Sequence, residues 1–140
     1  MYAEKSDLLT GAAWDRTMDW IINQNDRGLT IKDIVVDSKS WGNYTDSSFN
    51  VTGTGILAKT GAFGGYTKVN NIYDLAGNVY EWSSETNTAD SSRPCVFRGG
   101  YYNYSGSDDP ASVRDSISTT RSYDNIRVSF RTLFVDLSTV

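Results

Sequence analysis

The block Asn71–Trp82, with the sequence NIYDLAGNVYEW, constrains the fold more than any other part of the chain, together with Arg98-Gly99-Gly100, which begins sixteen residues after Trp82. Glycine reaches backbone conformations that other residues rarely adopt, so we expect Gly77 to form a tight turn. The aromatic side chains of Tyr80 and Trp82 are expected in the core. The block therefore predicts a fold organised around ordered loops more than around long regular elements.

An amphipathic helix is expected near the start of the chain, over Gly11–Asn23, with Thr10 as its N-cap. Four apolar residues recur there at the spacing of one helix face: Trp14, Met18, Ile21 and Ile22. This pattern is typical of a helix that packs against a core.

Few other regular elements are indicated. Three segments are expected as strands, namely Val51–Ala58, Val96–Arg98 and Ile126–Val135. The short apolar segment Leu29–Val36 is of undetermined type, and Ser40–Tyr44 and Gly61–Tyr66 are expected as packed loops that carry aromatic residues. We therefore expect one α+β domain over residues 1–140, with short helices and extensive loops, and its abrupt start indicates the C-terminal part of a longer protein.

Charge and hydropathy exclude several classes of protein. The net charge of −4 and the scattered Lys and Arg residues argue against nucleic-acid binding, which needs a concentrated basic surface. No apolar stretch approaches the roughly 18 residues that span a bilayer, so we expect no membrane insertion by this domain. Cys95 is the only cysteine, so an internal disulfide cannot form.

The last 44 residues, Phe97–Val140, contain no Lys, Glu, Gln, Met or Trp, whereas the first 96 contain fifteen of them. At the same frequency, about seven would be expected after position 96. These five are the amino acids whose codons always end in a purine. Within this stretch, sixteen of the 25 residues of Tyr101–Asn125 are Tyr, Ser, Asp or Asn. Asn codons mutated only at their first two bases would leave this composition.

The central block and the Arg-Gly-Gly triplet resemble the signature of the formylglycine-generating, sulfatase-modifying enzyme family. Leu9–Asp15 is similar to the helix start of that family, and Ile126–Arg131 is similar to its closing strand. The resemblance implies a C-type lectin-like fold of the formylglycine-generating-enzyme subtype, with small antiparallel sheets. It implies a scaffold over residues 1–100 and a closing strand over 126–140.

The chemistry of that family is not matched by this chain. Its oxidases use a pair of cysteines near the final strand to hold copper, but Tyr123–Arg131 contains no cysteine. Sulfoxide-forming relatives bind iron through histidines, and the chain has no histidine. Cys95 is expected to be a small, partly buried residue. We therefore expect no catalytic residues and no enzymatic activity.

A calcium site is the one cofactor that the resemblance implies. Relatives bind Ca²⁺ through this block, which would correspond to Asn78, Val79 and Glu81, and oxygen ligands suit that ion. The alternative is that Asn78 and Glu81 satisfy buried backbone groups of the loop.

The absence of Lys, Glu, Gln, Met and Trp after position 96 is typical of a separate branch of the same fold. The chain resembles the variable protein of a diversity-generating retroelement, in which a reverse transcriptase miscopies template adenines and the product replaces the end of a gene. The resemblance implies a hypervariable, non-catalytic surface over 101–125. It would bind an unknown protein or glycan on a cell surface and be displayed on a phage tail or a bacterial surface.

The residue types agree with a binding role, because Tyr gives large contact areas and Ser, Asn and Asp give adaptable hydrogen bonds. The candidate binding residues are Tyr101, Tyr102, Asn103, Tyr104, Ser105, Asp108, Asp109, Val113, Asp115, Ser116, Ile117, Ser118, Ser122, Tyr123, Asp124 and Asn125. Val113 and Ile117 are either exposed products of mutation or core residues, and Tyr102 could equally belong to the scaffold. The aspartates predict an acidic surface that favours a cationic or hydroxyl-rich partner.

The residues between these candidates are expected to be scaffold: Gly99, Gly100, Gly106, Pro110, Ala111 and Arg114. They are expected to fix turns or to reach inward. Two other functions stay open on the sequence alone. One is an oxidase of the formylglycine-generating type that uses Cys95, and the other is a calcium-dependent carbohydrate lectin.

Overall fold

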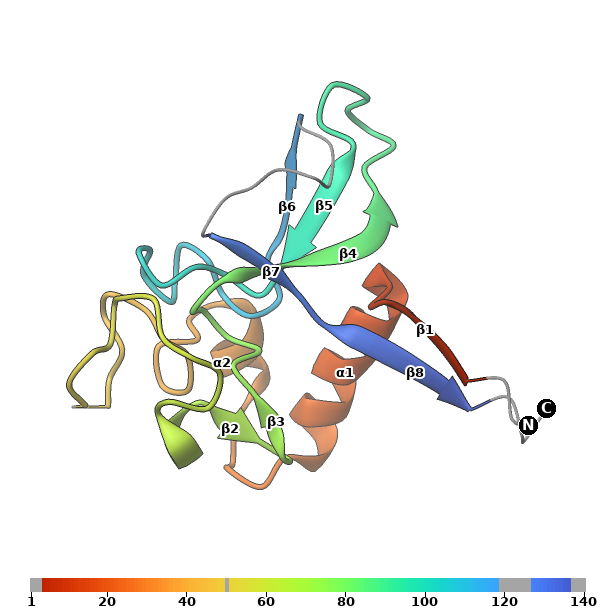
Figure 1. The fold of residues 1–140 in the computed structure, drawn as a ribbon. Helices are drawn as coiled ribbons and strands as arrows, with labels where there is room; N and C mark the ends of the chain where they lie inside the picture. The colour runs from red at the N-terminus through yellow and green to blue at the C-terminus, as the bar shows by residue number, and fades with distance from the viewer. Residues whose placement is uncertain (1–3, 50, 119–126, 137–140) are drawn as a thin grey trace.

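The computed structural model of the chain describes residues 4–49, 51–118 and 127–136, and it brings the two ends of this range together (Figure 1). Strand β1 (Glu4–Leu8) pairs antiparallel with β8 (Thr132–Asp136), with Leu8 opposite Thr132. Two helices and several small sheets are present, so the predicted α+β class is confirmed.

Helix α1 (Gly11–Gln24) confirms the predicted N-terminal helix and extends one residue beyond it. The Thr10 hydroxyl accepts a hydrogen bond of 3.0 Å from the Ala13 amide, which satisfies one of the free donors at the helix start. The predicted face is buried at Trp14, Met18 and Ile21. Among the helices that the structure describes, none is long and apolar enough to cross a membrane.

The undetermined segment after α1 is a second, short helix, α2 (Ile31–Val35). The Asp33 carboxylate caps its start, accepting hydrogen bonds from the Thr30 amide at 2.8 Å and from the Thr30 hydroxyl at 2.6 Å. Ile34 faces the core, whereas Ile31 and Val35 are exposed.

The largest sheet among the described residues has four strands, β4 (Tyr80–Thr86), β5 (Cys95–Arg98), β6 (Arg114–Ile117) and β7 (Val128–Phe130), in the order β6-β5-β4-β7 (Figure 1). We call it the central sheet. Strand β5 runs antiparallel to both of its neighbours, as predicted for small sheets. The β4–β7 pair differs from that prediction, because it is parallel. A 3₁₀ turn η1 (Gly64–Tyr66) leads into the short antiparallel pair β2 (Lys68–Val69) and β3 (Ile72–Tyr73).

Two clusters of buried side chains cover opposite faces of this sheet. Arg98 on β5 reaches Asp15 on α1, so its face of the sheet is the one toward α1. The cluster around α1 contains Leu9, Trp14, Met18, Ile21, Leu29, Ile34, Trp41, Tyr44, Val69, Leu75, Ala76 and Ala111. Successive strand residues point to opposite faces, which places Tyr80, Trp82, Cys95 and Phe97 in the second cluster, together with Tyr101.

The central block joins three loops at Gly77. Its amide donates a 2.6 Å hydrogen bond to the Gly99 carbonyl, and the Asn78 amide donates to the Asn43 carbonyl at 2.9 Å. Gly77 has φ +69°, and a Cβ atom at this position would collide with the backbone of Asn43. The conformation and the close approach both require glycine, which agrees with the predicted turn.

The predicted strand Val51–Ala58 is wrong, because this segment forms successive turns. Its backbone bonds to side chains and not to another strand. Asn43 accepts from the Gly55 amide and donates to the Ile56 carbonyl, while the Asn78 amide group pairs with both the N–H and the C=O of Ala58. These amides imitate a strand partner without requiring extended backbone.

The predicted single strand Ile126–Val135 is two strands within the residues described. Strand β7 pairs with β4 and β8 pairs with β1, and Arg131 lies between them. The chain changes partner at Arg131, whose side chain turns toward Glu81. Alternation of apolar residues continues across such a change of partner, so the pattern could not reveal it.

Candidate ligand-binding site

A pocket of about 210 Å³ lies against the second cluster, and we call it the sheet-face pocket. Its lining residues are Tyr80, Arg93, Phe97, Tyr104, Asp115, Ser116, Ile117, Arg127 and Val128. Directly opposite residues of neighbouring strands share a face of a sheet. The opposed pairs Phe97–Asp115 and Tyr80–Val128 therefore bring all four strands of the central sheet to this pocket.

Tyr80 and Phe97 form the aromatic wall of the sheet-face pocket, and they pack against further aromatic rings of the second cluster. The ring centroids of Tyr80 and Phe97 lie 4.3 Å apart, and Tyr101 stacks on Tyr80 at 5.7 Å. Trp82 meets Phe97 edge-on at 5.7 Å. Such ring pairs are favourable beyond the area that they bury, so this wall is rigid apolar surface.

A buried hydrogen bond fixes the loop that borders the pocket. The Tyr80 hydroxyl donates to the Asp109 carboxylate, and both residues are buried. Burial raises the pKa of Asp109, and burial together with the Asp109 carboxylate raises the pKa of Tyr80. Asp109 is therefore an anchor between the loop and β4.

Charged side chains line the open side of the pocket. Arg93 pairs with Asp115 at 3.3 Å, and both side chains are about half exposed. The guanidinium of Arg127 lies 5.5 Å from the ring centroid of Tyr101, within the range of a cation–π contact. The exposed ring of Tyr104 also lines the pocket, and it lies edge-on to Tyr101 at 5.9 Å.

The sequence candidates fall into three groups by exposure. Four are exposed, namely Asn103, Tyr104, Asp108 and Ser118; five are half-buried, namely Tyr102, Ser105, Val113, Asp115 and Ile117; and three are buried, namely Tyr101, Asp109 and Ser116. Tyr102, Val113 and Ile117 pack on the second cluster, which agrees with the scaffold alternative for each of them. Ser122, Tyr123, Asp124 and Asn125 lie outside the described residues.

The structure brings Tyr104, Asp115, Ser116 and Ile117 together in the sheet-face pocket. Of the aspartates expected to make this surface acidic, Asp108 is exposed and Asp124 lies outside the described residues. Asp109 is buried beneath Tyr80, and Asp115 is paired with Arg93. The charged lining residues are two arginines and one aspartate.

The predicted scaffold positions are mostly enclosed. A Cβ atom at Gly100 would collide with the Asp109 carbonyl, and Gly100 has φ +85°. Gly106 and Ala111 are buried. Arg114 on β6 differs from the prediction, because its side chain is exposed and pairs with Glu85 on β4 instead of reaching inward.

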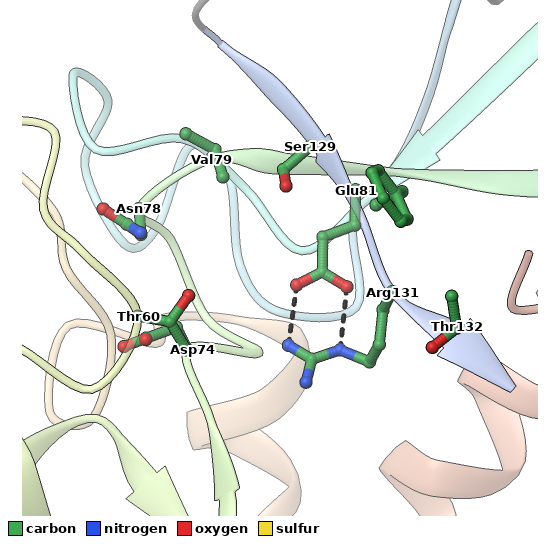
Figure 2. A pocket seen from close by; sticks show the side chains of 9 residues that line it. Thr60, Asp74, Asn78, Val79, Glu81, Ser129, Arg131 and Thr132 are labelled. Carbon is green, nitrogen blue, oxygen red and sulfur yellow. Dashed lines mark hydrogen bonds and ion pairs between the residues drawn. The ribbon is translucent and has the colours of Figure 1, made fainter.

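A second pocket, of about 300 Å³, lies where the central block meets the junction of β7 and β8, and we call it the motif pocket (Figure 2). The Glu81 carboxylate faces the Arg131 guanidinium there, with Nε to Oε2 at 2.9 Å and Nη2 to Oε1 at 2.7 Å. Arg131 also donates to the Tyr73 carbonyl. Burial raises the pKa of Glu81, and the Arg131 charge opposes that shift.

The residues that the resemblance assigned to calcium have protein partners. Asn78 Oδ1 accepts from the Ala58 amide at 3.0 Å and from Asn43 Nδ2 at 3.1 Å. Both oxygens of Glu81 accept from Arg131, and Val79 lines the same pocket. A guanidinium bound to the only carboxylate of the set does not fit a Ca²⁺ ion at that carboxylate. In the part of the chain that is described, no three His, Cys, Asp or Glu side chains gather as metal ligands.

Cys95, the residue on which an oxidase mechanism would depend, is buried on β5. It packs in the second cluster among aromatic rings. The residue is thus buried more fully than the partly buried position that was expected for it.

Three pocket arginines were missed by sequence reasoning. Arg93 and Arg127 reach the sheet-face pocket from loops, and Arg131 reaches Glu81 across fifty positions of sequence. No local pattern marks such residues. Tyr80 and Phe97 were detectable as strand aromatics, but their place in a pocket depends on the strand order.

No protein-family model matches the chain, and no curated protein matches it.

Proposed function

We propose that the chain is a non-catalytic ligand-binding domain whose surface over residues 101–125 is diversified by a retroelement. The observation that carries the proposal is that the sheet-face pocket takes four of its nine lining residues from the candidate set. These four residues, Tyr104, Asp115, Ser116 and Ile117, border a rigid aromatic wall. Rigid aromatic surface beside adaptable polar residues is the chemistry of antibody combining sites.

The distribution of the missing amino acids supports the same proposal. Seven of the nine lining residues of the pocket lie in Phe97–Val140, the stretch that contains none of the five amino acids whose codons always end in a purine. The other two are Tyr80, in the central block, and Arg93. Diversification would then change the pocket while leaving the block intact.

We also propose the C-type lectin-like fold of the formylglycine-generating-enzyme subtype. Three features support it: Gly77 bonds to Gly99 of the Arg-Gly-Gly triplet, Arg98 of that triplet pairs with Asp15 on α1, and the Leu9 amide donates a hydrogen bond to the Arg131 carbonyl. The segments that resemble the family are therefore in direct contact with one another.

Lack of catalysis is part of the proposal. The chain has no histidine, and its one cysteine is buried among aromatic rings. An oxidase of the formylglycine-generating type needs an accessible pair of soft ligands for copper. The ligand would be a protein or glycan on a cell surface, met by a phage tail or by a bacterial surface that displays this domain.

The experiment that tests this function is sequencing of the DNA around the gene. The expected result is a nearby copy of the segment that encodes residues 101–125, differing at template adenines and adjacent to a reverse-transcriptase gene. Differences spread over all four bases, or no copy at all, would overturn the retroelement origin.

A further inference from the structure

The motif pocket contains a buried carboxylate with one oxygen open to a ligand, and the proposed function does not use it. We propose that this pocket binds a primary ammonium group, which a lysine side chain of a protein or a free alkylamine would supply. The ammonium group would lie against Asp74, and its alkyl chain against Phe130. None of the nine residues that the structure shows lining the pocket falls within 101–125, so the site would stay the same while the proposed variable range changes.

Asp74 lines the pocket with one carboxylate oxygen unbound (Figure 2). The residue is only 7% exposed, and its Oδ2 accepts a 2.7 Å hydrogen bond from the Gly61 amide. Within the described residues, no hydrogen bond or ion pair reaches the other oxygen, Oδ1. A buried charge is costly unless it is paired, so a cation bound at Oδ1 would offset a cost that an exposed carboxylate does not have.

The charges described around the pocket leave one carboxylate in excess. Arg131 is matched by Glu81, because its Nε and Nη2 donate to the two carboxylate oxygens. Arg98 lies opposite Glu81 on β5 and is paired with a carboxylate of α1. Lys59 is exposed and is not a lining residue. An entering anion would therefore meet two carboxylates, whereas a cation would balance the charge of Asp74.

The single open oxygen favours an ammonium group over other cations. A guanidinium binds a carboxylate best through two parallel hydrogen bonds, as Arg131 does with Glu81, but Asp74 has only one oxygen to offer. An ammonium group is a compact charge with three donors, and the exposed hydroxyls of Thr60 and Ser129 line the same pocket as further acceptors. A calcium ion would need more oxygen ligands than the pocket has open.

Apolar side chains suit the alkyl chain of such a ligand. Phe130 on β7 lines the pocket and is 64% exposed, and the half-buried Val79 lines it as well. Lysine side chains bury their methylene groups along apolar surface while the ammonium group stays in polar surroundings. The volume of about 300 Å³ lies at the small end of the range for ligand pockets, roughly 300–1,000 Å³. One alkylammonium chain therefore agrees with the size and the chemistry of the pocket.

The test uses small probes on the intact chain, observed by amide NMR titration at constant ionic strength. Nα-acetyl-lysine methylamide presents the side chain, its Nε-acetylated form is the neutral counterpart, and Nα-acetyl-arginine methylamide carries the guanidinium. We expect the lysine probe to shift the amide signals of Gly61, Asp74 and Ser129. It should bind about tenfold more tightly than the acetylated form, and severalfold more tightly than the arginine probe.

Butylammonium separates the two sources of the ammonium group. Tighter binding of the lysine probe than of butylammonium would assign a protein side chain. Tighter binding of butylammonium would assign a free alkylamine. Both results support an ammonium site.

Variants assign the effect to Asp74. Asp74→Asn keeps an acceptor for the Gly61 amide but removes the charge, so it should weaken lysine-probe binding about tenfold and leave the acetylated probe unchanged. Asp46→Asn is the matched control, because Asp46 also accepts from a glycine amide, that of Gly106, and is not a lining residue. Thr60→Asp adds a carboxylate to the pocket and should tighten lysine-probe binding. A gain of affinity cannot come from misfolding, so this variant keeps the test decisive if Asp74→Asn does not fold.

Equal or tighter binding of the acetylated probe or of the arginine probe would overturn the ammonium assignment. Full affinity of the lysine probe for Asp74→Asn would place the ligand elsewhere and overturn the site. Failure of both the lysine probe and butylammonium to shift the pocket signals would overturn the whole proposal. None of these results bears on the retroelement origin, because the described lining residues lie outside the range that would be diversified.

Discussion

The hydroxyl of Tyr80 donates a hydrogen bond to the buried carboxylate of Asp109. Tyr80 belongs to the central block, and Asp109 belongs to the stretch with the composition of a diversified surface. Their hydrogen bond attaches that stretch to β4. Asp109 is therefore expected to behave as part of the scaffold although its residue type matches the variable set.

Tyr80→Phe should lower the free energy of unfolding by about 1–3 kcal/mol, because it leaves a buried carboxylate without its hydrogen-bond donor. Urea denaturation measures the change. Tyr104→Phe is the matched control, since Tyr104 is exposed, and it should change stability by less than about 0.5 kcal/mol. Equal effects of the two variants would show that the Tyr80–Asp109 contact contributes nothing.

The stability of the wild type relative to Asp109→Asn should depend on pH. Burial raises the pKa of Asp109 above its ordinary value of 3.8 in the folded state. The folded state then holds the proton more tightly than the unfolded chain, so this contribution is complete below 3.8 and is lost as pH rises through the folded pKa. As pH rises through that range, the free energy of unfolding of Asp109→Asn should therefore increase relative to that of the wild type, and urea denaturation at a series of pH values measures the difference. A carboxyl ¹³C titration midpoint for Asp109 at or below 3.8 would contradict this expectation.

Arg131→Met should destabilise the fold by about 3 kcal/mol, because it leaves the buried Glu81 carboxylate unpaired. The double variant Glu81→Gln with Arg131→Met should recover much of that loss, since no buried charge remains. Arg93→Met, which breaks the exposed pair with Asp115, is the control and should cost less than about 1 kcal/mol. Thermal and urea denaturation both report these differences. A double variant as unstable as Arg131→Met alone would argue against the ion pair as the cause.

Chelation should leave the melting temperature unchanged. The Glu81 oxygens are bound to Arg131, and Asn78 is bound to Ala58 and Asn43. An ion that binds only the folded state would raise the melting temperature with its concentration. Melting curves in EDTA and in millimolar Ca²⁺ therefore make the comparison, and a clear rise in Ca²⁺ would show that the motif pocket rearranges to take the ion.

Substitutions in the candidate stretch should divide by burial. Tyr101→Ala should cost about 3 kcal/mol, because Tyr101 is buried and stacks on Tyr80. Tyr104→Ser should be nearly neutral for folding, because Tyr104 is exposed. Denaturation of both variants gives the comparison. A neutral Tyr101→Ala would mean that this position is free to vary with its neighbours.

The parts of the fold that the sequence predicted are those set by local interactions. Helix α1, its Thr10 cap and its buried face follow from spacing and capping, and the turn at Gly77 follows from glycine chemistry. The parts that were missed depend on distant partners. The Val51–Ala58 segment bonds to Asn43 and Asn78, and the junction at Arg131 depends on Glu81, neither of which a local pattern contains.

The candidate site divides in the same way. Residue types correctly indicated that Tyr104 is exposed, but they could not show that Tyr101 is buried, because the same side chain suits a core and a surface. The two arginines of the sheet-face pocket come from loops whose approach depends on the strand order. Charge counted along the sequence therefore did not indicate that two arginines lie beside Asp115 in this pocket.

In the strand order β6-β5-β4-β7, strand β4 lies between β5 and β7. The chain leaves β5 at Arg98 and returns in β7 at Val128, and both strands are bonded to β4. The proposed variable range 101–125 lies between those two points, and β4 lies outside that range. Every version of the range that diversification would produce therefore keeps the same two points of attachment to β4.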